Sequence, residues 1–174
     1  MKKMLKNEGF TLIELLIVVA IIGIIAAIAV PGLLRARMSG NEASAIGSVR
    51  AVHSGNVSYF SVCGGYANAT FNQLTTNQYL PPDFGALATV NRAGYTIAIA
   101  AGNGAVASGL ATAMCAGGMT GFFTTAAPMN PGSTGTRYFA IRESGTIYQN
   151  LSAAIVDAPG GGPVVDANTT VLSQ

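Results

Sequence analysis

The sequence predicts an α+β protein in which one long N-terminal helix packs on a small antiparallel β-sheet. Two observations predict this fold class. A long apolar run near the start is followed by apolar residues at helical spacing, which indicates one extended helix. Between residues 94 and 150, short segments with β-branched and aromatic residues are separated by turn-forming residues, which indicates strands. The 174 residues leave room for about one globular domain beside the helix.

The apolar run is long enough to cross a membrane. Residues 15–34 contain no charged and no strongly polar side chain. A helix of this length spans about 30 Å, which is the thickness of a bilayer hydrocarbon core. The flank before it is basic, carrying Lys2, Lys3 and Lys6. The positive-inside rule puts such a flank in the cytoplasm, so we expect the rest of the chain to lie outside the cytoplasm.

Two simple interpretations of this run leave Glu14 unexplained. A cleaved secretory signal peptide would use the small residues at 27–29, but the run continues past them and Pro31 follows. A plain membrane anchor would have to place the carboxylate of Glu14 in the membrane, which costs about 2.5–3.5 kcal/mol on insertion scales. A third interpretation, in which Glu14 has a function, is therefore needed.

The stretch "KNEGFTLIELLIVVAIIGIIAAIAVPGLL" closely resembles the start of type IV pilins and of the pseudopilins of type II secretion. The shared elements are a basic leader, the run from Gly9 to Glu14, and a long apolar helix that contains Pro31. The resemblance implies that prepilin peptidase cleaves between Gly9 and Phe10 and methylates the new terminus of Phe10. It also implies three regions: a leader (1–9), a transmembrane and filament-core helix (10–35), and an amphipathic helix with a globular β-sheet head of the pilin fold (36–174).

Cleavage would give Glu14 a charged partner. The new α-amino group of Phe10 is largely protonated at neutral pH, opposes the helix dipole and is costly in apolar surroundings unless paired. A carboxylate four residues later lies on the same helix face, so Glu14 can pair with its own terminus or with that of a neighbouring subunit. The resemblance favours the neighbour, as an assembly contact, and both pairings stay open as successive states.

Gly23 and Pro31 are predicted to shape the apolar helix. Proline lacks an N–H group and clashes with the preceding turn, so Pro31 should kink or loosen the helix. The resemblance implies a loosened stretch between these two positions in assembled filaments. The alternative is a transmembrane proline that is tolerated without any role in assembly.

The helix is expected to continue beyond the membrane and to end at "CGGY" (63–66), because glycines serve as helix C-caps. Five apolar residues form the stripe predicted to pack on the sheet: Ile46, Val49, Val52, Val57 and Phe60. Ser39 and Glu42 have capping-box spacing, so a break near Gly40 is the alternative.

Beyond residue 66, the sequence predicts an irregular connection with short helical turns (67–93) and then a meander of three or four antiparallel strands. The strand candidates are 94–101, 119–127 and a hairpin over 136–150 that turns at residues 143–145. The small-residue segment 102–118 is expected to be a surface loop, and the tail from residue 158 a loop with at most a short terminal strand.

No set of residues indicates catalysis, so we expect no catalytic, cofactor-binding or metal site and no enzyme activity. His53 is the only histidine, and the acidic residues of the globular part are scattered without the spacing of a calcium loop. Cys63 and Cys115 can form a disulfide outside the cytoplasm, although their positions in the sequence do not show that the sulfurs meet. The net charge of +2 gives no reason to expect a nucleic-acid partner.

The resemblance implies a structural subunit of a type IV pilus-like filament, which is a helical homo-oligomer. The implied partners are prepilin peptidase, an inner-membrane assembly platform and, before assembly, membrane lipid. The subunit would wait in the bacterial inner membrane with its head in the periplasm, and then enter an extracellular pilus or a periplasmic pseudopilus. Two alternatives remain: the major pseudopilin of a type II secretion system, and a membrane-anchored periplasmic binding module.

Overall fold

The fold is described from a computed structural model that covers residues 10–67, 70–112, 115–158 and 168–172. The chain divides into two units, Met1–Arg37 and Met38–Gln174. One helix, α1 (Leu12–Cys63), contributes to both units and is uninterrupted in sequence. The alternative of a break near Gly40 is therefore wrong. The predicted leader, residues 1–9, lies outside the described residues.

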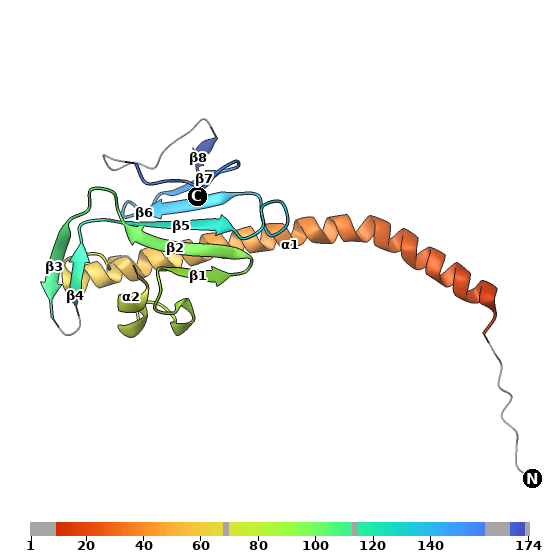
Figure 1. Ribbon diagram of the computed structural model, residues 1–174, viewed down its shortest axis with the longest axis horizontal. Helices are drawn as coiled ribbons and strands as arrows, with labels where there is room; N and C mark the ends of the chain where they lie inside the picture. Colours follow the sequence, from red (N-terminus) through yellow and green to blue (C-terminus); the bar gives the residue numbers. More distant parts are fainter. Residues whose placement is uncertain (1–9, 68–69, 113–114, 159–167, 173–174) are drawn as a thin grey trace, which may run out of the picture. The chain divides into compact units, whose positions relative to one another are not determined.

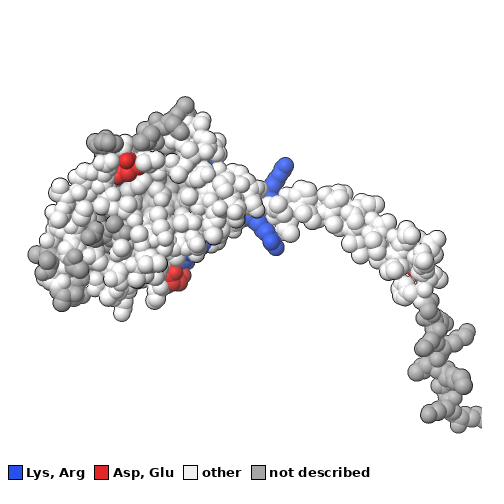
Figure 2. All heavy atoms as spheres, in the orientation of Figure 1, with Lys and Arg blue, Asp and Glu red and all other residues white. Residues whose placement is uncertain are grey.

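The first unit consists of the apolar part of α1. This part is the only helix among the described residues that is long and apolar enough to cross a membrane. Its large side chains are exposed, and Pro31 lies inside the helix. Figure 2 shows the visible face of this part almost free of charge, with blue Lys and Arg side chains only at its C-terminal end. An exposed surface of this composition is suited to lipid or to other apolar helices.

The second unit is built around a six-stranded antiparallel sheet in the order β1-β2-β5-β6-β7-β8. Figure 1 shows the central strands alongside the C-terminal half of α1. The strands are β1 (Thr89–Arg92), β2 (Tyr95–Ala101), β5 (Phe122–Pro128), β6 (Tyr138–Arg142), β7 (Ile147–Asn150) and β8 (Thr169–Val171). The predicted strands at 94–101 and 119–127 correspond to β2 and β5, and the predicted hairpin at 136–150 corresponds to β6 and β7, so these predictions are confirmed. The short terminal strand is also confirmed, as β8. The expected count of three or four strands is wrong, because β1 and β8 extend the sheet at its two edges.

One stripe of α1 forms the helix side of the core. Its buried apolar residues recur at intervals of three, four or seven: Ala45, Val49, Val52, Tyr59 and Cys63. The prediction is confirmed for Val49 and Val52, and Ile46 packs partly buried against the same cluster. It is wrong for Val57 and Phe60, which are 44% and 41% exposed. Each of these two lies one residue after a buried position, so the helical turn of about 100° per residue carries it off the packed face.

The end of α1 is fixed by a glycine cap and by a disulfide. Gly64 adopts a left-handed conformation (φ +70°), and its N–H donates to the carbonyl of Phe60 at 2.8 Å. This confirms that the "CGGY" segment ends the helix. Cys63, the last helical residue, is joined to Cys115 by a disulfide with a Cα–Cα distance of 5.5 Å. The helix end is therefore bonded covalently to the residue just before β4 (Ala116–Met119).

Residues 102–118 are not the surface loop that the sequence predicts. They contain β3 (Ala107–Ala111) and most of β4 (Ala116–Met119), which pair as a separate two-stranded sheet. A side chain at Gly109 would have its Cβ only 2.6 Å from the carbonyl oxygen of Cys63, so backbone packs directly on backbone here. Alanine and glycine have little β propensity. We therefore attribute the formation of β3 and β4 to this tight packing and to the disulfide.

The connection between α1 and the sheet matches its prediction in outline. It contains two short helical turns, α2 (Asn72–Thr76) and the 3-10 helix η1 (Pro82–Phe84). The strand β1 lies at its end and was not predicted, because "TVNR" is short and carries two polar residues and an arginine. β1 forms through its pairing with β2, which is a tertiary contact that a local pattern does not report.

A buried carboxylate connects α1 to the loop before β6. Glu42 is 5% exposed, and its Oε1 accepts from the N–H of Thr136 at 2.9 Å. Its Oε2 accepts from Nε of Arg137 at 2.8 Å and lies 2.6 Å from Nη2 of the same residue. Burial raises the pKa of Glu42, but the hydrogen bonds from Thr136 and Arg137 and the positive charge of Arg137 outweigh it, so the pKa lies below its usual 4.5.

We expect Glu42→Gln to lower the free energy of unfolding by about 2 kcal/mol at pH 7, because it removes charge-assisted hydrogen bonds from a buried site. Since the folded-state pKa is lowered, the contribution of Glu42 is present above the unfolded-state pKa and is lost as the pH falls through the folded value. Urea denaturation in detergent micelles at pH 7 and pH 3 measures this. Asp83→Asn, at an exposed carboxylate, is the control. A Glu42→Gln deficit that is equally large at both pH values would contradict the interpretation.

Removing the disulfide with Cys63→Ser and Cys115→Ser together should lower the free energy of unfolding by about 4 kcal/mol. The bond closes a loop with a sequence separation of 52 residues, and that loop restricts the unfolded chain. Urea denaturation of the oxidised protein and of the double variant measures the difference. Dithiothreitol should shift the midpoint of the original chain and leave the double variant unchanged, and equal midpoints in all samples would refute the prediction.

Candidate functional site

A reciprocal hydrogen-bonded cap starts α1. The backbone N–H of Thr11 donates to Oε2 of Glu14 at 3.0 Å, and the Thr11 hydroxyl donates to the same oxygen at 2.6 Å. In return, the N–H of Glu14 donates to the Thr11 hydroxyl oxygen at 3.3 Å. This is a capping box, with Thr11 as the N-cap residue and Glu14 at the third helical position. It fixes the carboxylate of Glu14 at the N-terminal end of the helix, where the helix dipole favours negative charge.

The cap lies next to the predicted cleavage point. Phe10 precedes it in a non-helical conformation and is 85% exposed, while Gly9 lies outside the described residues. In the uncut chain the nitrogen of Phe10 belongs to a peptide bond and carries no charge. The pairing of Glu14 with a free Phe10 amine therefore stays a prediction, and the structure adds that Thr11 already occupies one oxygen of this carboxylate.

The sequence analysis missed the role of Thr11, although a signal for it exists. "TLIE" (11–14) has the spacing of a capping box immediately before an apolar run. The same spacing was noted at Ser39 and Glu42, where no helix begins. Those two residues lie inside α1, and Glu42 bonds to residues far away in the sequence instead. A capping box is informative only where a helix actually starts.

Gly23 and Pro31, the predicted kink positions, lie on α1, and so does His53, the histidine for which no metal or catalytic role is expected. Gly23 has open space around it, since a Cβ there would meet nothing within 4 Å, and its role with Pro31 in loosening the helix stays a prediction. His53 lies beside the sheet with Nε2 3.3 Å from the carbonyl oxygen of Glu143. Among the described residues, no group of three or more His, Cys, Asp or Glu side chains could hold a metal ion.

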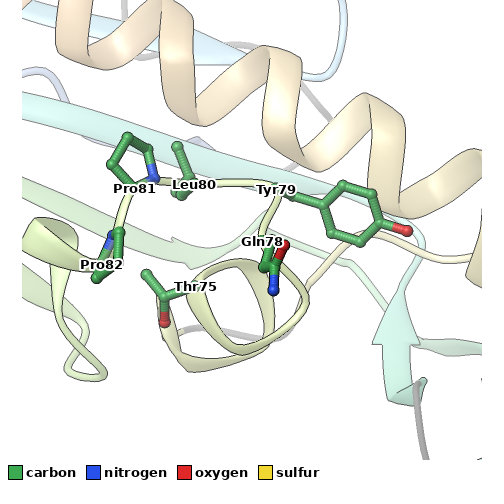
Figure 3. Close-up of a pocket in the computed structure, with 6 residues that line it drawn as sticks. All are labelled: Thr75, Gln78, Tyr79, Leu80, Pro81 and Pro82. Carbon is green, nitrogen blue, oxygen red and sulfur yellow. The ribbon is translucent and has the colours of Figure 1, made fainter.

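A cavity of about 470 Å³ lies beside α2 (Figure 3). Figure 3 shows the side chain of Leu80, one of the residues that line this cavity, pointing toward α1. The cavity is lined by Thr75, Gln78, Tyr79, Leu80, Pro81 and Pro82. This lining contains no carboxylate, histidine or cysteine, so it offers no general base that could activate the hydroxyl of Thr75 or Tyr79. The capped N-terminus of α1 is thus the stronger candidate for a functional site.

Comparison with known proteins assigns the N-terminal segment. Residues 4–30 match the family described as the prokaryotic N-terminal methylation motif. The chain is also 38% identical over 98 residues to the type IV major pilin protein PilA of Myxococcus xanthus. This match covers 56% of the chain and 40% of that relative. The chain is therefore similar to type IV pilins over part of its length. No solved structure matches this chain.

A second relative matches over a shorter stretch. The chain is 63% identical over 35 residues to the type IV wide pilus major component PilA4 of Thermus thermophilus. This match covers 20% of the chain and 27% of that relative. The chain thus spans less than half the length of either relative.

Thr11→Val should loosen the start of α1, because valine keeps the shape of threonine but has no hydroxyl to share with Glu14. We expect a loss of about 1 kcal/mol in local helix stability, read as faster amide hydrogen exchange at Glu14 in detergent micelles. Thr11→Ser is the matched control and should keep most of the protection. Equal exchange rates in the valine and serine variants would show that the cap does not hold the first turn.

Proposed function

We propose that this chain is the structural subunit of a type IV pilus-like filament, processed by prepilin peptidase and polymerised through its N-terminal helix. The observation that carries the proposal is the capped carboxylate of Glu14 at the head of an uncharged helix, inside a matched methylation motif. The names of the two relatives, a major pilin and a major pilus component, support it.

Processing would act just before the cap. Phe10 is exposed and α1 begins only at Leu12, so cleavage before Phe10 would not require the helix to unwind. Cleavage creates an amine on Phe10, which becomes N-methylated and stays charged. Because Thr11 holds Glu14 through one oxygen, Oε2, the second oxygen is available to a neighbour's amine.

Polymerisation would replace lipid by other copies of the same helix. The exposed apolar side chains of residues 12–34 need an apolar environment. Lipid supplies it before assembly, and a bundle of parallel helices supplies it afterwards. Gly23 and the alanines on this helix permit close approach between helices. Pro31 can locally release backbone hydrogen bonds as the helices pack.

The cellular location follows from the same physics. The subunit would sit in the bacterial inner membrane with its head in the periplasm, attached to an inner-membrane assembly platform, and would then pass into an extracellular filament. The disulfide between Cys63 and Cys115 supports a head outside the reducing cytoplasm. The chain would act as a substrate of the processing enzyme and as a building block, with no catalytic role of its own.

Glu14→Gln tests the proposal, because it keeps the size of the side chain and removes the charge that would pair with the Phe10 amine. We expect mature subunits that begin at methylated Phe10 but at least a tenfold loss of filaments sheared from cells, measured by N-terminal mass spectrometry and immunoblotting. Asp83→Asn makes the same acid-to-amide change at an exposed site and should leave filaments unchanged.

Three results would contradict the proposal. Normal filament yield in Glu14→Gln would remove the role of the carboxylate. An uncut leader on a chain that stays in the membrane would favour a tethered binding module. Fibres confined to the periplasm would instead favour the major pseudopilin of a type II secretion system.

A further inference from the structure

The loop after β2 contains an exposed asparagine that is followed by glycine. Asn103 and Gly104 form the only Asn-Gly pair in the sequence, and both residues are exposed. The N–H of Ala105 donates to the carbonyl of Gly102 at 2.8 Å, and Gly104 has a φ of +76°. Residues 102–105 are thus a β-turn with Gly104 at its third position, where a positive φ favours glycine.

Gly104 leaves the backbone nitrogen that follows Asn103 accessible. Glycine has no Cβ, and a Cβ built at Gly104 would meet nothing within 4 Å, so the outer side of the turn is open to water. Among the described residues, no atom accepts a hydrogen bond from the N–H of Gly104. This nitrogen can therefore approach the side-chain amide carbon of Asn103 without first losing a bond to the protein.

We propose that Asn103 deamidates spontaneously in the folded protein. The deprotonated backbone nitrogen of Gly104 attacks Cγ of Asn103 and forms a five-membered imide, while the bond between Cγ and Nδ2 breaks. Nδ2 leaves as ammonia, which carries away the proton taken from Gly104. Water then opens the imide at either carbonyl, and residue 103 becomes aspartate or isoaspartate. Water is the only co-reactant, so the reaction does not depend on the proposed filament.

The reaction alters a contact that the amide of Asn103 makes with a distant part of the chain. The backbone N–H of Asn103 donates to Oδ2 of Asp157, and Nδ2 of Asn103 donates to the carbonyl of Asp157 at 3.3 Å. Deamidation replaces Nδ2 by an oxygen that cannot donate, and it adds a negative charge beside the Asp157 carboxylate. Asp157 also holds the buried Arg142, with Oδ1 3.2 Å from Nη2. The modified loop is therefore less firmly attached to the segment that pairs with Arg142.

The test ages the full, folded chain in determined conditions: detergent micelles at pH 8 in water labelled with ¹⁸O. Peptide mass spectrometry then follows the uptake of ¹⁸O at each asparagine. We expect residue 103 to react at least tenfold faster than Asn130, which is also exposed but is followed by Pro131, whose nitrogen has no hydrogen to lose. The rate at residue 103 should rise with the hydroxide concentration, because the attacking nitrogen must lose its proton.

Matched variants connect the reaction to its effect. Asn103→Gln lengthens the side chain by one carbon and disfavours the ring closure, so the acidic species that isoelectric focusing detects in the aged chain should be absent. Asn130→Gln is the control and should keep these species. Asn103→Asp supplies one of the two products directly and should lower the urea midpoint as ageing does. Asn130→Asp makes the same change away from Asp157 and should leave the midpoint unchanged.

Several outcomes would overturn the proposal. Equal ¹⁸O uptake at Asn103 and Asn130, or unchanged acidic species in Asn103→Gln, would show that Asn103 is not the reactive residue. Conversion of Asn103 only after unfolding in urea would show that the fold protects it. An aged chain with the urea midpoint of the fresh chain would refute the weakened contact with Asp157. All measurements use dissolved subunits, so they stand whether or not the chain forms filaments.

Discussion

The packing of one stripe of α1 on the sheet is the contact on which the rest of the head depends. Val49, Val52 and Tyr59 are fully buried in it, and full burial of a large apolar side chain contributes about 1.5–3 kcal/mol. Other interactions, an ion pair and a disulfide, fix the two ends of this contact. Glu42 pairs with Arg137 at the N-terminal end, and the disulfide of Cys63 holds the C-terminal end. Between them the helix runs for about 30 Å at 1.5 Å per residue, so the apolar stripe is fixed in both register and rotation.

Two carboxylates on one helix behave differently because their surroundings differ. Glu14 bonds to a residue three positions away and is exposed, so local geometry determines its position. Glu42 is buried and bonds to residues more than 90 positions away, so the tertiary fold determines its position. A sequence motif describes only the local case, which explains why one spacing rule applies at residue 11 and fails at residue 39.

Much of the fold could be predicted from the sequence, where the pattern was local and strong. The apolar run, the glycine cap at Gly64 and the β6–β7 hairpin each have a signal within a few residues. The β3–β4 sheet has none, because alanine and glycine strands form only where a helix end and a disulfide hold them. The buried stripe of α1 was predicted only in part, because the prediction followed apolar residues alone. Glycines and polar residues such as Asn56 also occupy buried positions on this helix.

The cross-link at the last residue of α1 has a mechanical consequence. A helix pulled along its axis commonly frays from a free end, losing one hydrogen bond after another. At Cys63 that end is not free, because two covalent routes leave the same residue, one through the peptide bond to Gly64 and one through sulfur to Cys115. Tension that reaches this point is divided between the two routes, and the end of the helix cannot move away from Cys115 while the sulfur–sulfur bond is intact.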